Sequence, residues 1–374
     1  MTDVFISADS LITPFGIGSQ LAFDEIKSGK TAIQKHPNSD FSSNELYAAI
    51  IEEKDEWFSH LNLDDSYTRL EKLIILCLKN LFESNQLKIS DKTLIVLSST
   101  KGNISVLDNP NQNFPRERAY LTSLTQKIES YFQIPNPIQI VSNACISGSL
   151  AIEYAKRWIQ LGVYEDAIVI GADEVSKFIV SGFESFQAVS STFCKPFDAD
   201  RIGINLGEAI GAVYLTKNPA VNSVKILGSG NYNDANHISG PSRTGEGLYR
   251  SIQKAMEDSG VEIDYISAHG TATLYNDEME SIAYQRSSLL EVPTNSLKGY
   301  FGHTLGTSGI LEIIMGIHSL RTNTLIKSYG FDNQGTSEPV NIIQENKTQE
   351  INAFLKTAAG FGGSNIATIF QKLT

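Results

Sequence analysis

Short apolar runs alternate with amphipathic segments along nearly the whole chain, and this alternation constrains the fold more than any other feature. Runs such as 94–97 and 167–170 are apolar and strand-like, whereas the segment 147–160 carries apolar residues at the spacing of a helix that packs against a sheet. Strands that alternate with helices are typical of α/β proteins. We therefore predict an α/β fold, with further helices at 67–82 and 121–131.

A second series of strands and helices begins after residue 220 and repeats the rhythm of the first. It is predicted to contain strands at 224–227, 265–268, 294–297, 354–357 and 367–370, and helices at 247–258, 278–290 and 305–320. The two series share almost no residue identity, so the pseudo-repeat rests on element order alone. We place an N-terminal half at 1–220 and a C-terminal half at 221–374. No low-complexity linker separates them, so we expect them to pack as one body.

The composition fits a folded globular protein and argues against several other classes. The chain has 374 residues and is 41% hydrophobic, which is enough to bury a large core. Thirty Lys and Arg against 42 Asp and Glu give a net charge of −12, which argues against general nucleic-acid binding. No run approaches the roughly 18 apolar residues of a membrane-spanning helix, and the N-terminus lacks a signal-type segment. We therefore expect no membrane insertion and a cytoplasmic location.

The three cysteines are too few and too widely spaced to indicate a disulfide framework or a zinc cluster, so we expect no metal site. One of them, Cys145, lies between a short apolar strand and a helix, in the segment Asn-Ala-Cys-Ile-Ser-Gly-Ser. Free N–H groups and the positive dipole end at a helix N-terminus stabilise a thiolate and lower its pKa. Cys145 is therefore a candidate nucleophile, although a lone cysteine is more often a small buried filler.

Two histidines lie in glycine-containing segments of the second half. His269 leaves the end of an apolar strand into a loop of Gly and Thr, where hydroxyls can orient its ring. His303 ends the segment that begins at Lys298, and Glu312 follows nine residues later on the next predicted helix. Taken alone, His269 could satisfy backbone groups at the end of the strand, and the segment from Lys298 to His303 could be a solvated surface loop.

The segment Gly-Phe-Gly-Gly-Ser-Asn at 360–365 is a fourth motif. Its glycines allow backbone conformations that aim N–H groups at an oxyanion. By itself, this segment could also be only a tight turn.

In this order and at this spacing, the four motifs resemble the β-ketoacyl synthase family of fatty-acid and polyketide synthesis. That family carries an Ala-Cys nucleophile motif, then His-Gly-Thr-x-Thr, Lys-x-x-x-Gly-His and Gly-Phe-Gly-Gly-x-Asn elements, which match 144–145, 269–273, 298–303 and 360–365. Lesser matches at 195–208 and 234–237 extend the resemblance over most of the chain. The resemblance implies a thiolase-like fold in which two pseudo-repeated halves form an αβαβα layered core.

The resemblance also implies a ping-pong condensation. Cys145 would take an acyl chain from acyl carrier protein or coenzyme A as a thioester, with the backbone N–H groups of Cys145 and Phe361 as the oxyanion hole. His269 and His303 would bind the thioester carbonyl of the malonyl group and favour loss of carbon dioxide. Phe361 corresponds to the family's gating aromatic residue. No cofactor is implied beyond the phosphopantetheine of the acyl carrier protein, which is the expected partner.

The same resemblance makes Lys298 the family's active-site lysine and gives four further residues supporting roles. Lys298 would hold the local charge and geometry, with Glu312 as its ion-pair partner. Thr271 and Thr273 match hydroxyls that line the malonyl site. Phe183 is placed beside the acyl pocket by its position in the chain.

Three alternatives share the fold. A thiolase needs a second, late cysteine as base, and Cys194 is the last one here. A synthase that starts chains from coenzyme A has Asn where this chain has His303. A chain-length factor is a non-catalytic subunit that has lost its nucleophile, which Cys145 argues against.

The resemblance leaves the pathway and the partner subunit open. Ala359 stands where fatty-acid synthases often carry a larger aromatic residue, which makes a specialised type II polyketide or polyene pathway an option beside fatty-acid elongation. A two-fold dimer is expected through the apolar strand at 137–142. The partner in that dimer is either a second copy or a chain-length factor.

Overall fold

The computed structural model describes residues 2–37, 40–108, 114–234 and 240–373. Three residues of the 234–237 match, numbers 235–237, therefore lie outside the described part of the chain. Most of the long helices and strands lie close to those predicted from the sequence, and the helix predicted at 147–160 has those bounds in the structure.

One continuous sheet runs through the molecule and contains eleven strands of the described chain. Its strands from the first half are β1 (Phe5–Thr13), β2 (Gly16–Ile17), β5 (Thr93–Ser98), β6 (Gln139–Val141), β7 (Asp166–Asp173) and β9 (Ala209–Thr216). Those from the second half are β10 (Val224–Asn233), β11 (Tyr265–Ser267), β12 (Thr294–Asn295), β15 (Ala353–Gly360) and β16 (Ser364–Lys372). The two halves join where β1 pairs with β10 at Phe5 and Lys225.

The strand order is the same in both halves. From its outer edge inward, the first half runs β6-β5-β7-β9-β1 and the second runs β12-β11-β15-β16-β10. In each series the outer three strands are parallel, and the fourth is antiparallel to both of its neighbours. The pseudo-repeat predicted from element order is therefore confirmed by topology.

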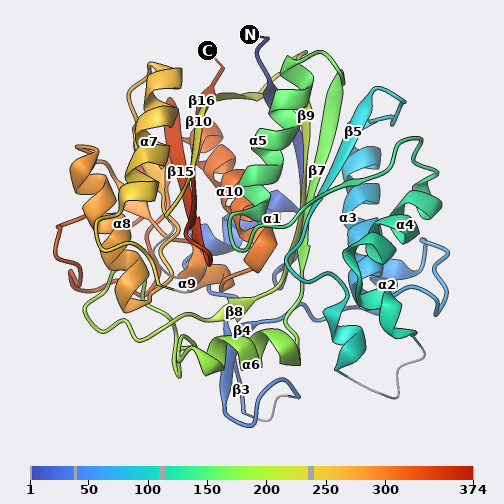
Figure 1. Cartoon of the computed structure of the whole chain (residues 1–374), viewed down its shortest axis with the longest axis horizontal. Coiled ribbons are helices and arrows are strands. Elements are labelled where there is room, and N and C mark those ends of the chain that lie inside the picture. Colours follow the sequence, from blue (N-terminus) through green and yellow to red (C-terminus); the bar gives the residue numbers. More distant parts are fainter. Residues whose placement is uncertain (1, 38–39, 109–113, 235–239, 374) are drawn as a thin grey trace.

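Helices form a middle layer and two outer layers around the two halves of the sheet (Figure 1). The middle layer consists of α5 (Ser147–Gln160) and α10 (Ser308–Thr322), and α10 is buried along almost its whole length. One outer layer contains α3 (Arg69–Asn85) and α4 (Leu121–Phe132), and the other contains α7 (Glu246–Ser259) and α8 (Leu274–Arg286). This is the αβαβα arrangement implied by the family resemblance.

The two middle helices approach each other closely at their first turns. A Cβ atom added to Gly309 would lie 2.4 Å from Ser149 Oγ and 2.6 Å from the Ser149 backbone nitrogen. Such distances leave no room for a side chain, so glycine at position 309 permits the contact. The N-termini of α5 and α10 therefore meet in the centre of the molecule.

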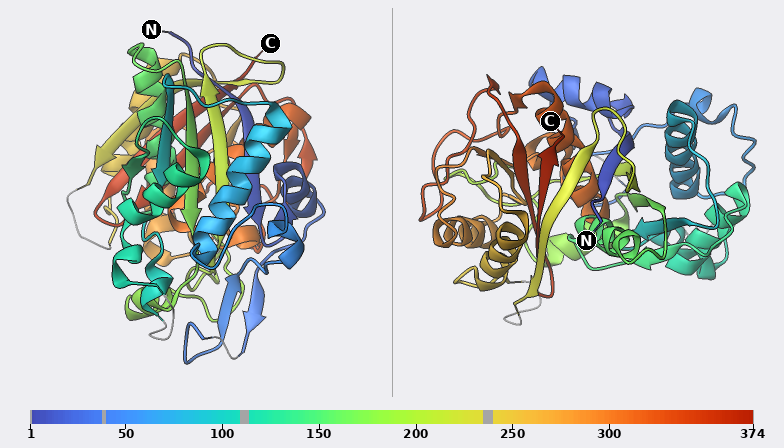
Figure 2. Two further views of the ribbon diagram at one scale, coloured as in Figure 1. Left: turned by 90° about the vertical axis from the view of Figure 1, so that its right-hand side faces the viewer. Right: turned by 90° about the horizontal axis from the view of Figure 1, so that it is seen from above.

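A smaller three-stranded sheet projects from one end of the molecule, as Figure 1 and the left view of Figure 2 show. Its strands are β3 (Gln34–His36), β4 (Leu46–Ala49) and β8 (Leu206–Gly207). The remaining elements are α1 (Ser19–Lys27), α2 (Asp55–Phe58), α6 (Lys177–Ser185), α9 (Lys298–Phe301), β13 (Thr324–Leu325) and β14 (Lys347–Thr348). No helix of the described chain is both long and apolar enough to cross a membrane.

Two differences from the sequence prediction, at α8 and at Lys298, lie close to the predicted site. Helix α8 runs from Leu274 to Arg286 instead of 278–290, because its first turns bury Asp277 and Glu280 as acceptors for backbone N–H groups. Lys298 lies at the start of the short, buried helix α9, so the segment is not a solvated surface loop. The apolar pattern could not reveal either feature.

Candidate active site

Cys145 lies between β6 and the first turn of α5, just behind a strained residue. Ala144 has φ of +43°, a left-handed conformation that non-glycine residues adopt rarely. This conformation turns the chain sharply into α5, which begins two residues after the cysteine. Cys145 is only 8% exposed, and its side chain lines a cavity that opens between the two halves of the fold.

In the resting site, the pKa of the Cys145 thiol is shifted in the direction opposite to the one predicted from the sequence. Burial raises the pKa of its thiol to about 11. The Lys298 ammonium and the backbone N–H of Phe361 act in the other direction but do not outweigh the loss of solvent. The lowered pKa predicted from the helix N-terminus is therefore wrong, and the thiol needs a base or a substrate-driven change to react.

Two histidines of the second half approach Cys145. The cysteine sulfur and one ring nitrogen of each of His269 and His303 lie within 4.8 Å of one another. The two imidazole rings are nearly perpendicular, with centroids 5.4 Å apart. Burial lowers the pKa of both histidines well below the ordinary value of 6.5, and the charge of Lys298 adds to the shift. At neutral pH both rings are therefore neutral, and each carries one N–H donor.

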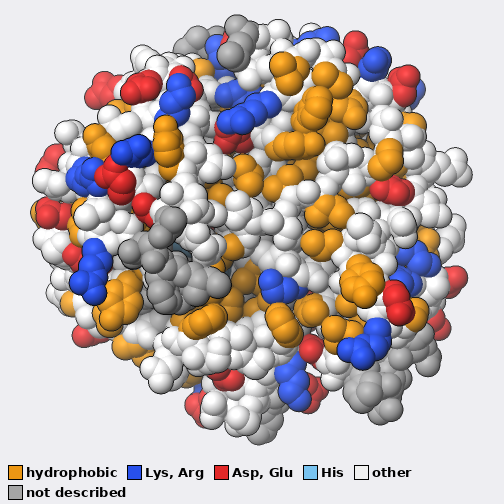
Figure 3. All heavy atoms as spheres, in the orientation of Figure 1, with side chains coloured by type: hydrophobic (Ala, Val, Ile, Leu, Met, Phe, Trp, Pro, Cys, Tyr) orange, Lys and Arg blue, Asp and Glu red, His pale blue; other side chains and the backbone are white. Residues whose placement is uncertain are grey.

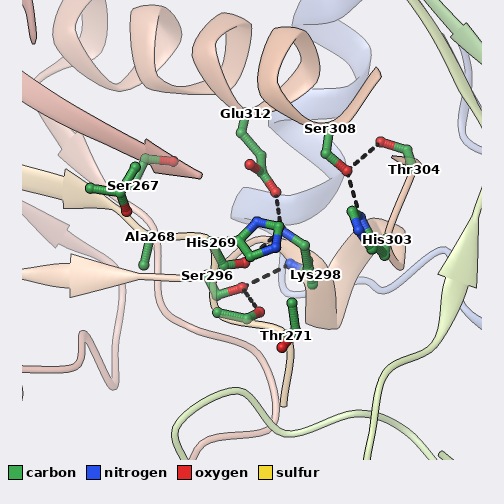
Figure 4. Close-up of polar contacts among 12 residues, drawn as sticks. Ser267, Ala268, His269, Thr271, Ser296, Lys298, His303, Thr304, Ser308 and Glu312 are labelled. Carbon is green, nitrogen blue, oxygen red and sulfur yellow. Dashed lines mark hydrogen bonds and ion pairs between the residues drawn. The ribbon is translucent and has the colours of Figure 1, made fainter. Parts of the chain in front are cut away.

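The backbone of His269 is held from two sides at the end of β11. Glu280 on α8 accepts the N–H of His269 at 2.9 Å and that of Gly270 at 2.6 Å. The carbonyl oxygen of His269 accepts a hydrogen bond of 2.5 Å from Lys298 Nζ (Figure 4). These contacts use only main-chain atoms of His269 and Gly270, so they fix the backbone from which the imidazole projects and leave its nitrogens unoccupied.

Behind the histidines lies a buried charge cluster of Lys298, Glu312 and Lys356. Each lysine Nζ is 2.7 Å from a different oxygen of Glu312, and all three residues are at most 2% exposed. Lys356 Nζ also donates to the carbonyl oxygens of Ser267, Ala268 and Thr357. Every described partner of this nitrogen is an acceptor, so the charged ammonium form fits the site. Burial lowers the pKa of Lys356, and the Glu312 carboxylate opposes this shift. With both lysines protonated, the cluster carries two positive charges and one negative charge.

Lys356 and Glu280 were not identified from the sequence. Lys356 interrupts the otherwise apolar and small residues of β15, and that interruption is the signal which could have found it. Glu280 lies on a helix with many polar residues, where nothing in the sequence separates a buried carboxylate from exposed ones.

His303 binds a short chain of hydroxyl groups through its second nitrogen. Its Nδ1 atom lies 2.8 Å from Ser308 Oγ, which lies 3.1 Å from Thr304 Oγ1 (Figure 4). Its Nε2 atom is buried and has no hydrogen-bond partner among the described residues. The ring therefore keeps one nitrogen free for a substrate atom.

The cavity in front of these groups has a volume of about 570 Å³. The predicted gating residue Phe361 lines it, together with three of the predicted supporting residues, Phe183, Thr271 and Thr273. The rings of Phe183 and Phe361 stack with centroids 5.7 Å apart, and the hydroxyls of the two threonines lie 2.8 Å apart. Lys298 and Glu312 lie behind the histidines and are not among the residues that line the cavity.

The cysteine and the two histidines are also ligand types that bind Zn²⁺ in proteins. Their close grouping would allow a metal ion to compete for the thiol and the imidazoles. The expectation that the site works without a metal stays a prediction.

A repeated thiolase-like fold with a buried thiol and two neutral imidazoles around one cavity defines a condensing-enzyme architecture. Residues 1–220 match the family described as "Beta-ketoacyl synthase, N-terminal domain", and residues 223–332 match "Beta-ketoacyl synthase, C-terminal domain". The chain belongs to the β-ketoacyl synthase family.

Two curated relatives illustrate the similarity. The chain is 33% identical over 264 residues to 3-oxoacyl-[acyl-carrier-protein] synthase 2 of Rhizobium meliloti (strain 1021), a match that covers 65% of this chain and 62% of that protein. It is 26% identical over 430 residues to the putative mitochondrial 3-oxoacyl-[acyl-carrier-protein] synthase of Schizosaccharomyces pombe. The second match covers 100% of this chain and 99% of the relative.

Solved structures share the whole fold. A TM-score of 0.89 at 25% identity relates the chain to the ketosynthase ApeO in complex with its chain length factor ApeC from Xenorhabdus doucetiae. That match covers 100% of this chain and 98% of the other. A β-ketoacyl synthase from Burkholderia phymatum gives a TM-score of 0.88 at 24% identity over the full length of both chains. The predicted thiolase-like fold is therefore confirmed.

Proposed function

We propose that the chain is a β-ketoacyl-[acyl-carrier-protein] synthase, an acyltransferase that condenses a malonyl unit with an acyl group held on Cys145. The observation that carries this proposal is the meeting of Cys145, His269 and His303 within 4.8 Å at the wall of one cavity. The first residue belongs to one half of the fold and the other two belong to the second half. Family membership supplies the reaction class.

In the first half-reaction, Cys145 Sγ attacks the carbonyl carbon of an acyl thioester. The carbon–sulfur bond to the carrier breaks, and the carrier thiol takes up the proton released by the cysteine. The backbone N–H groups of Cys145 and Phe361 stabilise the negative oxygen that forms during the attack. The N–H of Phe361 already faces the Cys145 sulfur, which supports this role.

In the second half-reaction, a malonyl thioester occupies the cavity. The neutral rings of His269 and His303 donate hydrogen bonds to its thioester carbonyl oxygen and stabilise the enolate that remains when carbon dioxide leaves. The enolate carbon then attacks the acyl carbonyl, the bond to Cys145 Sγ breaks, and the product leaves on its carrier. Burial is the main reason that both rings stay neutral, and the nearby charges of Lys298 and Lys356 act in the same direction. The same positive charges favour the enolate.

The non-catalytic alternative, a chain-length factor, is disfavoured by the same geometry. Cys145 is present and opens onto the cavity, whereas a subunit that only shapes its partner's pocket needs no nucleophile. The thiolase alternative needs a second thiol at the site. Cys194 instead donates to the carbonyl oxygen of Lys298, Cys77 contacts Ser10, and neither lines the cavity.

We propose acyl carrier protein as the carrier of both substrates, with its phosphopantetheine as the only prosthetic group involved. The pathway is fatty-acid elongation or a type II polyketide or polyene route, and Ala359 at the cavity wall is the residue that favours the specialised routes. The cytoplasmic location stays a prediction, and the Schizosaccharomyces pombe relative is described as mitochondrial.

The proposal is tested by incubating the protein with malonyl-loaded and acyl-loaded carrier protein. We expect release of carbon dioxide, transfer of the acyl group to Cys145, and a β-ketoacyl product detected by mass spectrometry. The Cys145→Ala variant should lose acyl transfer. A chain that binds carrier protein but gives neither carbon dioxide nor acyl-enzyme would support the non-catalytic alternative.

A further inference from the structure

A single hydrogen-bond partner influences which ring nitrogen of His303 carries the proton. The residue is 1% exposed, and among the described residues only Ser308 Oγ bonds to its Nδ1 atom. Ser308 is 2% exposed and Thr304 is 1% exposed, and Thr304 Oγ1 has Ser308 Oγ as its hydroxyl partner. The three side chains form a linear chain of hydrogen bonds that runs from His303 through Ser308 to Thr304 (Figure 4).

A hydroxyl partner differs from a backbone partner in its effect on a histidine. A carbonyl oxygen only accepts, so it fixes the ring proton on the bonded nitrogen, and a backbone N–H only donates, so it fixes the proton on the other nitrogen. A hydroxyl group does either. Ser308 can donate to Nδ1 while it accepts from Thr304, or it can accept from Nδ1–H while it donates to Thr304.

The two half-reactions need different tautomers of the same ring. Decarboxylation needs an N–H at Nε2 that points into the cavity, because the malonyl carbonyl oxygen accepts it. Acylation needs a lone pair at Nε2, because burial raises the pKa of the Cys145 thiol and a base must take its proton. A ring fixed in one tautomer would serve only one of these steps well.

We propose that Ser308 and Thr304 are positioning residues that let His303 serve as the base in acylation and as the donor in decarboxylation. This proposal rests on the proposed synthase function. In acylation, Nδ1–H donates to Ser308 while Nε2 takes the Cys145 proton and returns it to the departing carrier thiol. Between the half-reactions, water in the cavity removes one ring proton and supplies the other. In decarboxylation, Ser308 donates to Nδ1, and Nε2–H donates to the malonyl carbonyl oxygen.

Thr304 provides a test that leaves His303 and its direct partner in place. In Thr304→Val the size of the side chain is kept, but the Ser308 hydroxyl hydrogen then has Nδ1 as its remaining acceptor within the described hydroxyl chain. This favours the tautomer with the proton on Nε2. We expect acylation of Cys145 to slow by about tenfold, the effect of one hydrogen bond, while carbon dioxide release changes by less than about twofold.

Two further variants complete the design. Thr304→Ser keeps the hydroxyl and should retain the acylation rate of the parent protein. Thr307→Val is a matched control, because Thr307 Oγ1 is a buried hydroxyl one residue from Ser308 without a partner among the described residues. It should leave both half-reactions unchanged. Histidine-labelled protein followed by nitrogen NMR should show both tautomers of His303 in the parent and mainly the Nε2–H form in Thr304→Val.

The outcomes separate the inference from the proposed function. Equal slowing of both half-reactions in Thr304→Val, or an unchanged tautomer population, would overturn the role of the hydroxyl chain. A parent protein that neither acylates Cys145 nor decarboxylates malonyl carrier protein would overturn the proposed function instead. The NMR measurement then still reports whether the two hydroxyls set the tautomer.

Discussion

Lys356 Nζ lies 2.7 Å from Glu312 Oε2, on the carboxylate oxygen that Lys298 leaves free. Two ammonium groups therefore share one carboxylate directly behind the histidines. A single lysine paired with Glu312 would be neutral as a unit, whereas this cluster keeps one positive charge. That charge opposes protonation of the imidazoles and attracts an enolate.

Replacing Lys356 tests this charge. In Lys356→Met the remaining pair, Lys298 and Glu312, is neutral, so protonation of His269 and His303 becomes easier. We expect the acid limb of the decarboxylation pH profile, where a histidine gains a proton, to move to higher pH. Acylation of Cys145 at pH 8 should change less. The profile of carbon dioxide release against pH is the measurement.

A double variant separates charge from shape in the same experiment. Lys356→Met combined with Glu312→Gln restores a net charge of one through Lys298 alone. If the charge governs the histidines, the acid limb returns toward its parental position. If it stays displaced, the lysine acts through the position of β11, which its contacts to Ser267 and Ala268 would explain. Lys88→Met, at an exposed lysine, is the surface control.

The ring of His269 can be removed with little change to its loop, because Glu280 and Lys298 bind only its main-chain atoms. We expect His269→Ala to reduce carbon dioxide release by roughly 10²–10⁴-fold, the usual contribution of a positioned donor or acid. Acyl transfer to Cys145 should persist, and its rate is followed with a radiolabelled acyl carrier. His60→Ala, at an exposed histidine, serves as the control. Unchanged decarboxylation would remove His269 from the proposed mechanism.

Cys145 should be the cysteine that alkylating reagents modify first. It opens onto the cavity, whereas Cys77 and Cys194 are at most 1% exposed and burial raises the pKa of each to about 12. Since the pKa of Cys145 is about 11, its labelling rate should rise by about tenfold per pH unit above neutrality. Peptide mapping after brief iodoacetamide treatment gives the sites. Labelling of Cys77 or Cys194 at a similar rate would contradict this prediction.

The contact between the middle helices predicts a strong effect on stability. A methyl group in Gly309→Ala would overlap Ser149, and we expect the free energy of unfolding to fall by about 1–3 kcal/mol or more. Gly182→Ala is the matched control, since nothing lies within 4 Å of a Cβ at that helical position. It should be neutral or slightly stabilising. Thermal unfolding of the two variants and the parent compares them directly.

Assembly is predicted from the outer strand of the first half. Within the described chain β6 pairs with β5 alone, and Figure 3 shows hydrophobic side chains gathered over α5 and the adjoining strands. An open strand edge beside apolar surface favours a two-fold dimer. Light scattering should give twice 41.0 kDa for a homodimer. Insolubility rescued by co-expression would indicate a chain-length factor as partner, and a stable monomer would contradict both.

The sequence predicted long elements better than short ones, for physical reasons. The helix at 147–160 has a clear apolar stripe and a glycine at 162 that ends it, so its bounds could be predicted. The strands β3, β4 and β8 have two to four residues and little apolar periodicity, so no pattern marks them. Their pairing arises only when distant segments meet.

The site shows the same division. Motifs located Cys145, His269 and His303 because each combines a reactive side chain with small neighbours. Contacts made through the fold were not predictable in this way. Ser308 and Lys356 acquire their roles only because α10 and β15 lie beside the histidines, and hydroxyls and lysines are common in any sequence.

The repeated strand order has a consequence for how such a site could arise and be altered. Cys145 follows β6, the outermost strand of the first half, and precedes the middle helix α5. His303 follows β12, the outermost strand of the second half, and precedes the equivalent helix α10. The connection from the outermost strand to the middle helix thus supplies the nucleophile in the first half and an imidazole in the second half. A single ancestral half could have offered only one of these groups unless two identical chains paired. A substitution designed at the start of α5 or of α10 must also fit the other helix, because the first turns of the two helices are in direct contact.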